Sequence, residues 1–322
     1  MIFAHGVGSR GDLPLPLWMF TWASAIALVV SFVALGVLWT RPQLARAADG
    51  RAVIAGSAEV GRSPGGTLLI AIQRVGQVAA LTLYLVALVS GLFGEDDTSN
   101  NLLPVALYVT VWVGAQVVNG LLGDVWRAIS PLNAIARLAE PAARRLGVSQ
   151  AEPPARLGQW PAAIGLFIFL FYELAHPSGA SPRALGVLLL IHTLITVILA
   201  AQWGANWVAD NEPFGALFSM LAAMGVLFAR GGGGLGIRPP MSGLARMPVV
   251  PGTLAVLLVV LGGTTFDGFS ESEAGRSVFG RPQGWGGAFT LTVGLVVSIV
   301  LISLLYAIGV WWTSRVTSLS TR

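Results

Sequence analysis

The sequence contains no cysteine and no lysine, and charged residues make up only 11% of its 322 positions. The absence of cysteine excludes disulfides, thiolate metal ligands and a cysteine nucleophile. The absence of lysine excludes Schiff-base catalysis, which needs the lysine amine. The glycine run 231–234 also lacks the lysine of a phosphate-binding P-loop. A soluble domain carries about 25% charged residues, so the low charge content argues against one.

Apolar residues, in contrast, are abundant. Hydrophobic residues make up 55% of the sequence, and the mean hydropathy is +0.75. These values predict a polytopic membrane protein. The formal net charge is +4, and all 19 basic residues are arginines. Because the arginines gather in particular loops between apolar runs, they indicate membrane orientation. We therefore expect the lipid bilayer as a partner and no nucleic acid.

Seven apolar runs predict an all-α, polytopic transmembrane helical bundle of about seven spans, within a range of six to eight. A spanning helix needs ~20 residues to cross ~30 Å of hydrocarbon. We expect the whole chain, 1–322, to form one integral membrane domain. The predicted spans lie near 15–39, 75–93, 102–122, 160–175, 185–201, 249–263 and 287–312.

Loop charge predicts the orientation of the chain. Arginines crowd loops 40–66 and 123–159, whereas the loop after the second run carries Glu95, Asp96 and Asp97 and no basic residue. Because positive charge collects in cytoplasmic loops, we expect the N-terminus outside and the C-terminus in the cytoplasm. The first run is also followed by arginines, which is typical of a stop-transfer segment rather than a cleaved signal peptide.

The apolar segment 213–228 is too short to span a membrane comfortably. If it crossed, the arginines at 230, 238 and 246 would lie outside and the acidic loop 267–273 would lie inside. That arrangement reverses the charge rule followed by the rest of the chain. We therefore predict that 213–228 is interfacial or re-entrant on the inner side, and that 131–146 is a second interfacial helix there.

Two stretches 81 positions apart are alike. Gly123-Asp-Val-Trp126 followed by Ser130-Pro resembles Gly204-Ala-Asn-Trp207 followed by Glu212-Pro. In each, the glycine closes a helix, the tryptophan suits the membrane interface, and Ser or Glu before Pro can cap a new helix. The pattern predicts an internal repeat of span, inner helix and span.

Ionisable groups at membrane depth are costly, so they are the first candidates for function. Glu173 and His176 end the fourth span with the Glu-x-x-His spacing of metal-binding helical bundles. The repeat pairs Glu173 with Asp267, at the outer end of the sixth span. The structural alternatives are a solvated helix end for Glu173, an interface position for His176 before Pro177, and a turn at Asp267.

His192 lies within the fifth span, roughly 10 to 13 Å from its outer end at 1.5 Å per residue. It is either a packing residue hydrogen-bonded between helices, or a ligand or general base that faces a polar cavity. His5 and Asp12 lie in the glycine-rich and proline-rich segment before the first span. That segment is either folded over the outer helix ends or a frayed terminus.

These groups suggest a divalent metal at the outer face. Imidazole and carboxylate ligands suit zinc, manganese or iron, and a metal with an open position supplies hydroxide near neutral pH. We expect His192 and Glu173 to be catalytic. The predicted ligands are His5, Glu173, His192 and Asp267, with His176 and Asp12 as further candidates.

Three segments carry a family resemblance: Ala4-His5-Gly6 through Trp18, Gly123-Asp-Val-Trp126 with Pro131, and Phe266-Asp267-Gly268. They resemble the bacterial, largely actinobacterial, membrane-integrated proteins called fenitrothion hydrolase-like. The resemblance implies a hydrolase of the bacterial plasma membrane that cleaves an apolar aryl phosphotriester, and it raises a hetero-oligomer with a related membrane subunit. It carries over no catalytic residue.

Three functions fit these observations. The first is a metal-assisted hydrolase that takes an apolar organophosphorus ester at the outer membrane face. The second is a small-molecule or ion transporter or channel, for which repeats and intramembrane polar groups are equally suited, although no predicted span is broken. The third is a subunit or assembly factor of a membrane redox or metal-handling complex.

Overall fold

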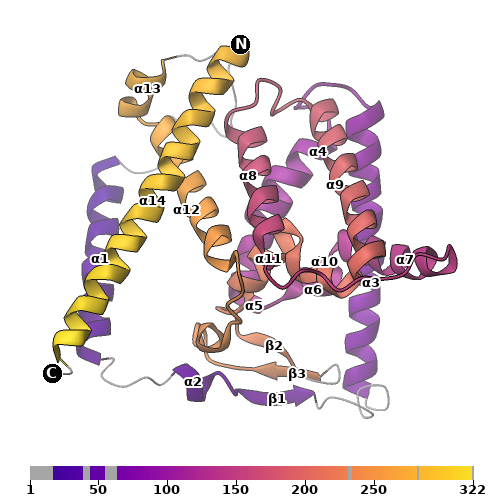
Figure 1. The fold of residues 1–322 in the computed structure, drawn as a ribbon, viewed down its shortest axis with the longest axis horizontal. Coiled ribbons are helices and arrows are strands. Elements are labelled where there is room, and N and C mark those ends of the chain that lie inside the picture. Colours follow the sequence, from indigo (N-terminus) through magenta and orange to yellow (C-terminus); the bar gives the residue numbers. More distant parts are fainter. Residues whose placement is uncertain (1–16, 39–43, 55–63, 231–233, 281–282, 321–322) are drawn as a thin grey trace.

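The computed structural model describes residues 17–38, 44–54, 64–230, 234–280 and 283–320, and most of these are helical (Figure 1). Five helical runs are long and apolar enough to cross a membrane by length and composition: Gly65–Phe93, Leu102–Leu122, Pro182–Trp203, Thr253–Ser270 and Gly284–Arg315. The prediction of a predominantly helical, membrane-type chain is therefore confirmed.

The elements follow one another as helices, with one small sheet drawn from two distant parts of the chain. In order they are α1 (Leu17–Leu38), α2 (Leu44–Ala47), β1 (Arg51–Ile54), α3 (Pro64–Phe93), α4 (Leu102–Pro104), the π-helix η2 (Val105–Ala115), α5 (Gln116–Leu122), α6 (Val125–Ile129), α7 (Pro131–Arg145), α8 (Trp160–Leu174), α9 (Pro182–Trp203), α10 (Ala205–Asn211), α11 (Pro213–Ala222), β2 (Leu227–Arg230), β3 (Gly234–Ile237), the 3₁₀ helix η4 (Ser242–Arg246), α12 (Thr253–Ser270), α13 (Glu273–Phe279) and α14 (Gly284–Ser320).

Several helices extend beyond the apolar runs that predicted them. Helix α3 begins at Pro64 rather than near 75, and α12 continues to Ser270 rather than ending near 263. The apolar run marks only the hydrocarbon-length part of a helix. Backbone hydrogen bonding continues into polar flanks such as Gln73-Arg74 in α3.

The third apolar run is not a regular α-helix. Eleven residues, Val105–Ala115, form the π-helix between α4 and α5. The hydroxyl of Thr110 donates to the carbonyl of Val105, five residues back. Stretches of π-helix are rare and are frequently found at functional sites. The run is nevertheless one continuous helical stretch, Leu102–Leu122, in line with the expectation that no span is broken.

The segment 213–228 was predicted as interfacial or re-entrant, and only its first part is helical. Helix α11 ends at Ala222, and strand β2 begins at Leu227. The backbones of Gly123 and Gly225 approach so closely that a Cβ on Gly225 would lie 2.4 Å from the nitrogen of Gly123. At this contact the chain passes from the helix to the sheet.

The sheet was not predicted from the sequence. Its order is β1-β3-β2, and both pairings are antiparallel. The strands have four residues each, too few for an alternating pattern to stand out. Because β1 comes from the loop after α1 and β3 comes from the segment after α11, the sheet brings residues 51–54 and 234–237 to one end of the molecule.

The loops of the bundle therefore separate into two ends (Figure 1). The sheet, α2, α7 and α10 lie toward one end, called here the sheet end. The α3–α4 loop with Glu95, Asp96 and Asp97, the α8–α9 loop and α13 lie toward the other, called here the acidic end. Helix α7, the predicted interfacial helix, begins and ends within one residue of its predicted limits.

At the acidic end, Asp96 joins the α3–α4 loop to the start of α9. Its carboxylate accepts hydrogen bonds from the hydroxyl of Ser181, at 2.7 Å, and from the backbone N–H of Arg183, at 3.1 Å, where α9 begins. These bonds hold the pKa of Asp96 below its ordinary value. A carboxyl group whose pKa is lowered by folding stabilises the fold above its ordinary pKa, and loses that effect as the pH falls through the folded pKa.

We expect Asp96→Asn to lower the melting temperature at neutral pH and to leave it unchanged in acid below the folded pKa. Thermal unfolding in detergent across this pH range measures the effect. Asp97→Asn is the control, since the Asp97 carboxylate accepts from the backbone N–H of Ser99 within its own loop and does not reach α9 among the described residues. A constant difference at every pH would contradict the charge-based explanation.

Candidate functional site

The structure brings together two of the predicted site residues at the acidic end. Glu173 lies in the last turn of α8 and Asp267 in the last turns of α12, and the two carboxylates are close enough for their charges to interact. The phenol of Tyr108, from η2, is close enough to Glu173 for the carboxylate charge to act on it. Its hydroxyl donates a hydrogen bond to the carbonyl of Gly179 at 2.7 Å. Two carboxylates whose charges influence each other are a common arrangement for acid–base chemistry.

His176 lies outside the helix and does not extend this pair as a helical Glu-x-x-His motif. Helix α8 ends at Leu174. The imidazole stacks on Tyr172 with ring centroids 4.3 Å apart and meets Trp285 edge-on at 5.2 Å. Its Nδ1 accepts from the N–H of Ser178 at 3.1 Å, and partial burial lowers its pKa. The geometry fits a neutral ring in an interface cluster, the structural alternative.

The predicted four-ligand metal set is not assembled by the residues that the structure describes. Among them, no group of three or more His, Asp and Glu side chains could hold a metal ion. His192 is therefore not joined to Glu173 and Asp267. His5 and Asp12, the other candidates, lie outside the described residues.

His192 instead faces a carboxylate that sequence reasoning treated only as a helix cap. It is the eleventh of the 22 residues of α9, so it lies about halfway along that helix. Its Nε2 is 3.8 Å from Oε1 of Glu212, within ion-pair range and beyond hydrogen-bond range. The Glu212 side chain is 2% exposed. A buried carboxylate near the middle of an apolar helix is costly, so its partners matter.

The partners of Glu212 are mainly backbone N–H groups. Its carboxylate accepts from Phe214 at 3.2 Å and from Gly215 at 2.6 Å, at the start of α11. The positive end of the α11 dipole therefore stabilises the negative charge. The indole N–H of Trp126 lies close enough to act on the carboxylate, but it makes no hydrogen bond of ordinary geometry.

A second pair of polar groups, Tyr84 and Thr193, lies near His192 and Glu212. The Tyr84 hydroxyl, from α3, shares a short hydrogen bond with the hydroxyl of Thr193, next to His192 in sequence. Tyr84 is also close enough to Glu212 for the carboxylate charge to act on its hydroxyl. Together, Tyr84, Trp126, His192, Thr193 and Glu212 form a partly buried polar group, called here the His192–Glu212 centre.

A cavity of about 620 Å³ lies at the sheet end, beside helices α10 and α11, between which Glu212 lies. Its wall includes residues of α10 and α11 on either side of Glu212, together with the start of α6, the sheet and the segment before α12. Charges of both signs line it. The ionisable residues in the wall are Asp124, Arg127, Asp210, Arg238 and Arg246.

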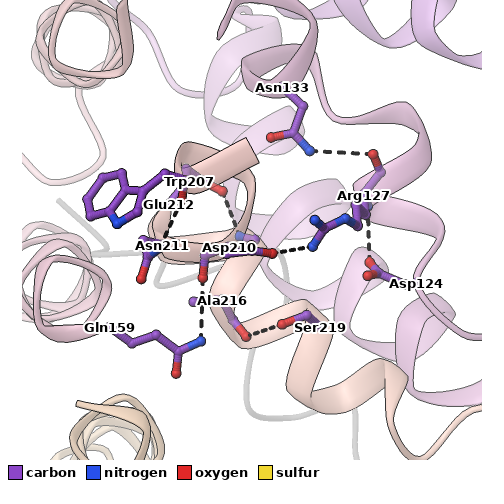
Figure 2. A network of polar contacts seen from close by, with 11 residues as sticks. Asp124, Arg127, Asn133, Gln159, Trp207, Asp210, Asn211, Glu212, Ala216 and Ser219 are labelled. Atoms are coloured by element: carbon purple, nitrogen blue, oxygen red, sulfur yellow. Dashed lines mark hydrogen bonds and ion pairs between the residues drawn. The ribbon is translucent and has the colours of Figure 1, made fainter. Parts of the chain in front are cut away.

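Arg127 organises the polar side of this cavity (Figure 2). Its guanidinium pairs with Asp210 of α10, while its own backbone N–H donates to Asp124 at 3.1 Å. Gln159 donates to the carbonyl of Asp210 and accepts from Thr253 at 2.8 Å. Burial raises the pKa of Asp124. These contacts fix α6, α10 and the start of α12 around one cavity.

Between the acidic-end carboxylates and Glu212 lies a continuous group of aromatic rings. Phe169 packs against Tyr108 at 5.9 Å, Trp112 at 4.9 Å and Phe214 at 5.2 Å, measured between ring centroids. Phe214 in turn meets Trp126 at 6.4 Å. Most of these rings belong to the buried core. The core between the two polar regions is therefore apolar and close-packed.

No family model, curated protein or solved structure matches this chain. The function must therefore be argued from the site itself.

Sequence reasoning missed Glu212, Tyr84 and Trp126 as members of a site. Tyr84 gives no local pattern, because an isolated tyrosine in an apolar run is ordinary. Glu212 had a usable signal. A glutamate at the start of an apolar segment predicted to re-enter the membrane must be buried with partners, and His192, although assigned to an outer site, is a polar group at comparable depth.

Proposed function

We propose that seven helices cross the bilayer, with α10 and α11 re-entrant and the sheet end in the cytoplasm. The pairing of β1 with β3 supports this count, since it requires an even number of crossings between residues 54 and 234. Four crossings meet that condition: α3, the α4–η2–α5 run, α8 and α9. A fifth crossing by α11 does not. The arginines of the sheet end support the orientation.

The predicted repeat is part of this proposal. Gly123 and Gly204 both adopt positive φ, and each is followed by a short helix. Ser130 and Glu212 then cap α7 and α11, and each helix begins with proline. These matching caps support two related units. The units differ in direction, because α7 lies along the surface and α11 is buried in the core.

For function, we propose a proton-coupled transporter of a small molecule. The observation that carries the proposal is the His192–Glu212 pair, in which the buried Glu212 lies beside the midpoint of α9 and next to a cavity at the proposed cytoplasmic side. Ionisable pairs at this depth typically mark ion or proton pathways. Glu212 takes up a proton from the cavity side, and His192 responds to its change in charge.

Two features of the backbone support transport over a purely structural role. Re-entrant helices and irregular backbone are tolerated at membrane depth where protein or a water-filled cavity surrounds them. Helices α10 and α11 are of this kind, and discontinuous helices typically build transporter binding sites. The aromatic rings from Tyr108 to Trp126 close the path toward the acidic end. The structure thus fits a state open only to the cytoplasm.

The hydrolase suggested by the family resemblance is the second candidate. It is favoured by the Glu173–Asp267 pair, with the Phe171, Tyr172, His176 and Trp285 rings beside it as a surface for an aryl group. On this proposal the carboxylates act as general base or metal ligands at the outer face, with His5 or Asp12 completing a zinc, manganese or iron site. A related membrane subunit would then co-purify with the chain.

One experiment separates the two candidates. Protein in liposomes is given a potassium diffusion potential, and proton uptake is followed with an enclosed pH-sensitive dye. We expect the wild type to take up protons at least tenfold faster than Glu212→Gln, because the amide cannot carry the proton. The same vesicles are assayed for hydrolysis of diethyl nitrophenyl phosphate.

The controls are Glu152→Gln, an exposed carboxylate at the sheet end, and Glu173→Gln. Proton uptake by the wild type that survives in Glu152→Gln and is lost in Glu212→Gln supports transport. If the wild type takes up no protons, the transport proposal is wrong. Hydrolysis that is lost in Glu173→Gln and unchanged in Glu212→Gln would establish the second candidate instead.

A further inference from the structure

Helix α7 presents three different faces, taking 100° of rotation per residue. The first face is formed by the buried residues Leu132, Ala136 and Ala143, and Ala136 packs in a cluster with Ala200 of α9 and Val208 of α10. This face attaches α7 to the bundle.

The second face is apolar and exposed. Leu138 is 67% exposed and lies next to Ala142 on this face, and Leu146, directly after the helix, is 83% exposed. Large apolar side chains this exposed on an otherwise polar helix are typical of helices that lie in the membrane interface.

Arg137 and Arg144 lie on a third face, whereas Arg145 lies about 20° from Leu138, at the edge of the apolar face. All three arginines are exposed. Arg144 is occupied, because it donates to Glu140 at 2.7 Å and to Gln150 at 2.8 Å. Arg137 and Arg145 make no ion pair with any residue that the structure describes. Two unpaired guanidinium groups therefore border the exposed apolar face.

The position of α7 suits the membrane surface. Figure 1 shows α7 running outward from the bundle, across the direction of α3 and α9. At the same end, Trp203 and Trp207 pack against each other at 4.5 Å between ring centroids. Paired tryptophans at a helix end are typical of the interface between hydrocarbon and headgroups.

We propose that α7 is a binding site for anionic phospholipids of the cytoplasmic leaflet. Leu138 and Leu146 insert among the acyl chains, and Arg137 and Arg145 hold the headgroup phosphates, for which the planar guanidinium gives paired hydrogen bonds. The positive-inside rule accounts for the general excess of arginine at this end. It does not account for two arginines without an ion pair among the described residues beside an exposed leucine on one helix. The proposal is independent of any transport or hydrolase activity.

The test is a lipid titration of the full chain in detergent, followed by native mass spectrometry. Phosphatidylglycerol and phosphatidylcholine are the two probes. We expect phosphatidylglycerol to bind more tightly to the wild type. In R137Q/R145Q this preference should fall about 25-fold, at roughly fivefold for each arginine near the membrane surface.

The matched control is R51Q/R156Q, which removes two exposed arginines from the same end but not from α7. We expect it to keep the preference, and high salt to weaken the preference in the wild type. An equal loss in the control would show that diffuse charge, not α7, attracts the lipid, and would overturn the proposal. Equal binding of both lipids by the wild type would also overturn it. Thermal unfolding of each variant verifies that it is folded.

Discussion

Gly123→Ala is expected to lower the free energy of unfolding by on the order of 3 kcal/mol or more. Gly123 has φ 127° and ψ −166°, a backbone conformation that residues with a Cβ avoid. An added Cβ would also lie 2.1 Å from the carbonyl oxygen of Leu227. That oxygen belongs to β2, which is held by its pairing with β3, so it cannot move away without disturbing the sheet.

Gly120→Ala is the matched control for this prediction. Gly120 lies in α5, one turn before Gly123, and nothing lies within 4 Å of a Cβ added there. Because alanine favours helix over glycine, this change should be neutral or stabilising by about 0.5 to 1 kcal/mol. Equilibrium unfolding in mild detergent measures both variants. If Gly123→Ala were as stable as Gly120→Ala, the close approach of α5 and β2 would not exist in solution.

The features that could be predicted from the sequence are those encoded locally. Glycine before Trp126 and Trp207, and Ser130 or Glu212 before proline, correctly marked where helices end and begin. Each such signal depends on two to five neighbouring residues and on a backbone conformation that few residue types accept. Most apolar runs were located for the same reason, although their flanks were not.

The features that could not be predicted depend on contacts between distant segments. Nothing in residues 51–54 indicates that they pair with 234–237, because four-residue strands have no clear period. His192 was assigned to an outer site because its depth was counted from the outer end of its span. The same count places it near the midpoint of α9, where its neighbour comes from α10 and α11. Depth limits the candidate partners of a side chain, and only the packing of helices selects one.

The other large effect is expected at Glu212. Glu212→Ala should lower the free energy of unfolding by about 3 kcal/mol or more, because it leaves the N–H groups of Phe214 and Gly215 buried without acceptors. Ser130→Ala, at the equivalent cap of α7, removes one acceptor, which bonds to Asn133, and should cost about 1 kcal/mol. Equilibrium unfolding compares the two variants.

Glu212→Gln separates the hydrogen bonds of this cap from its charge. The amide oxygen can still accept from Gly215, so most of the cap survives, whereas the interactions of the charge with His192 and the α11 dipole are lost. We therefore expect Glu212→Gln to be far more stable than Glu212→Ala while still abolishing proton uptake. A Glu212→Ala variant no less stable than Ser130→Ala would mean that water reaches the start of α11. Glu212 would then be exposed in the wall of the cavity rather than buried beside it.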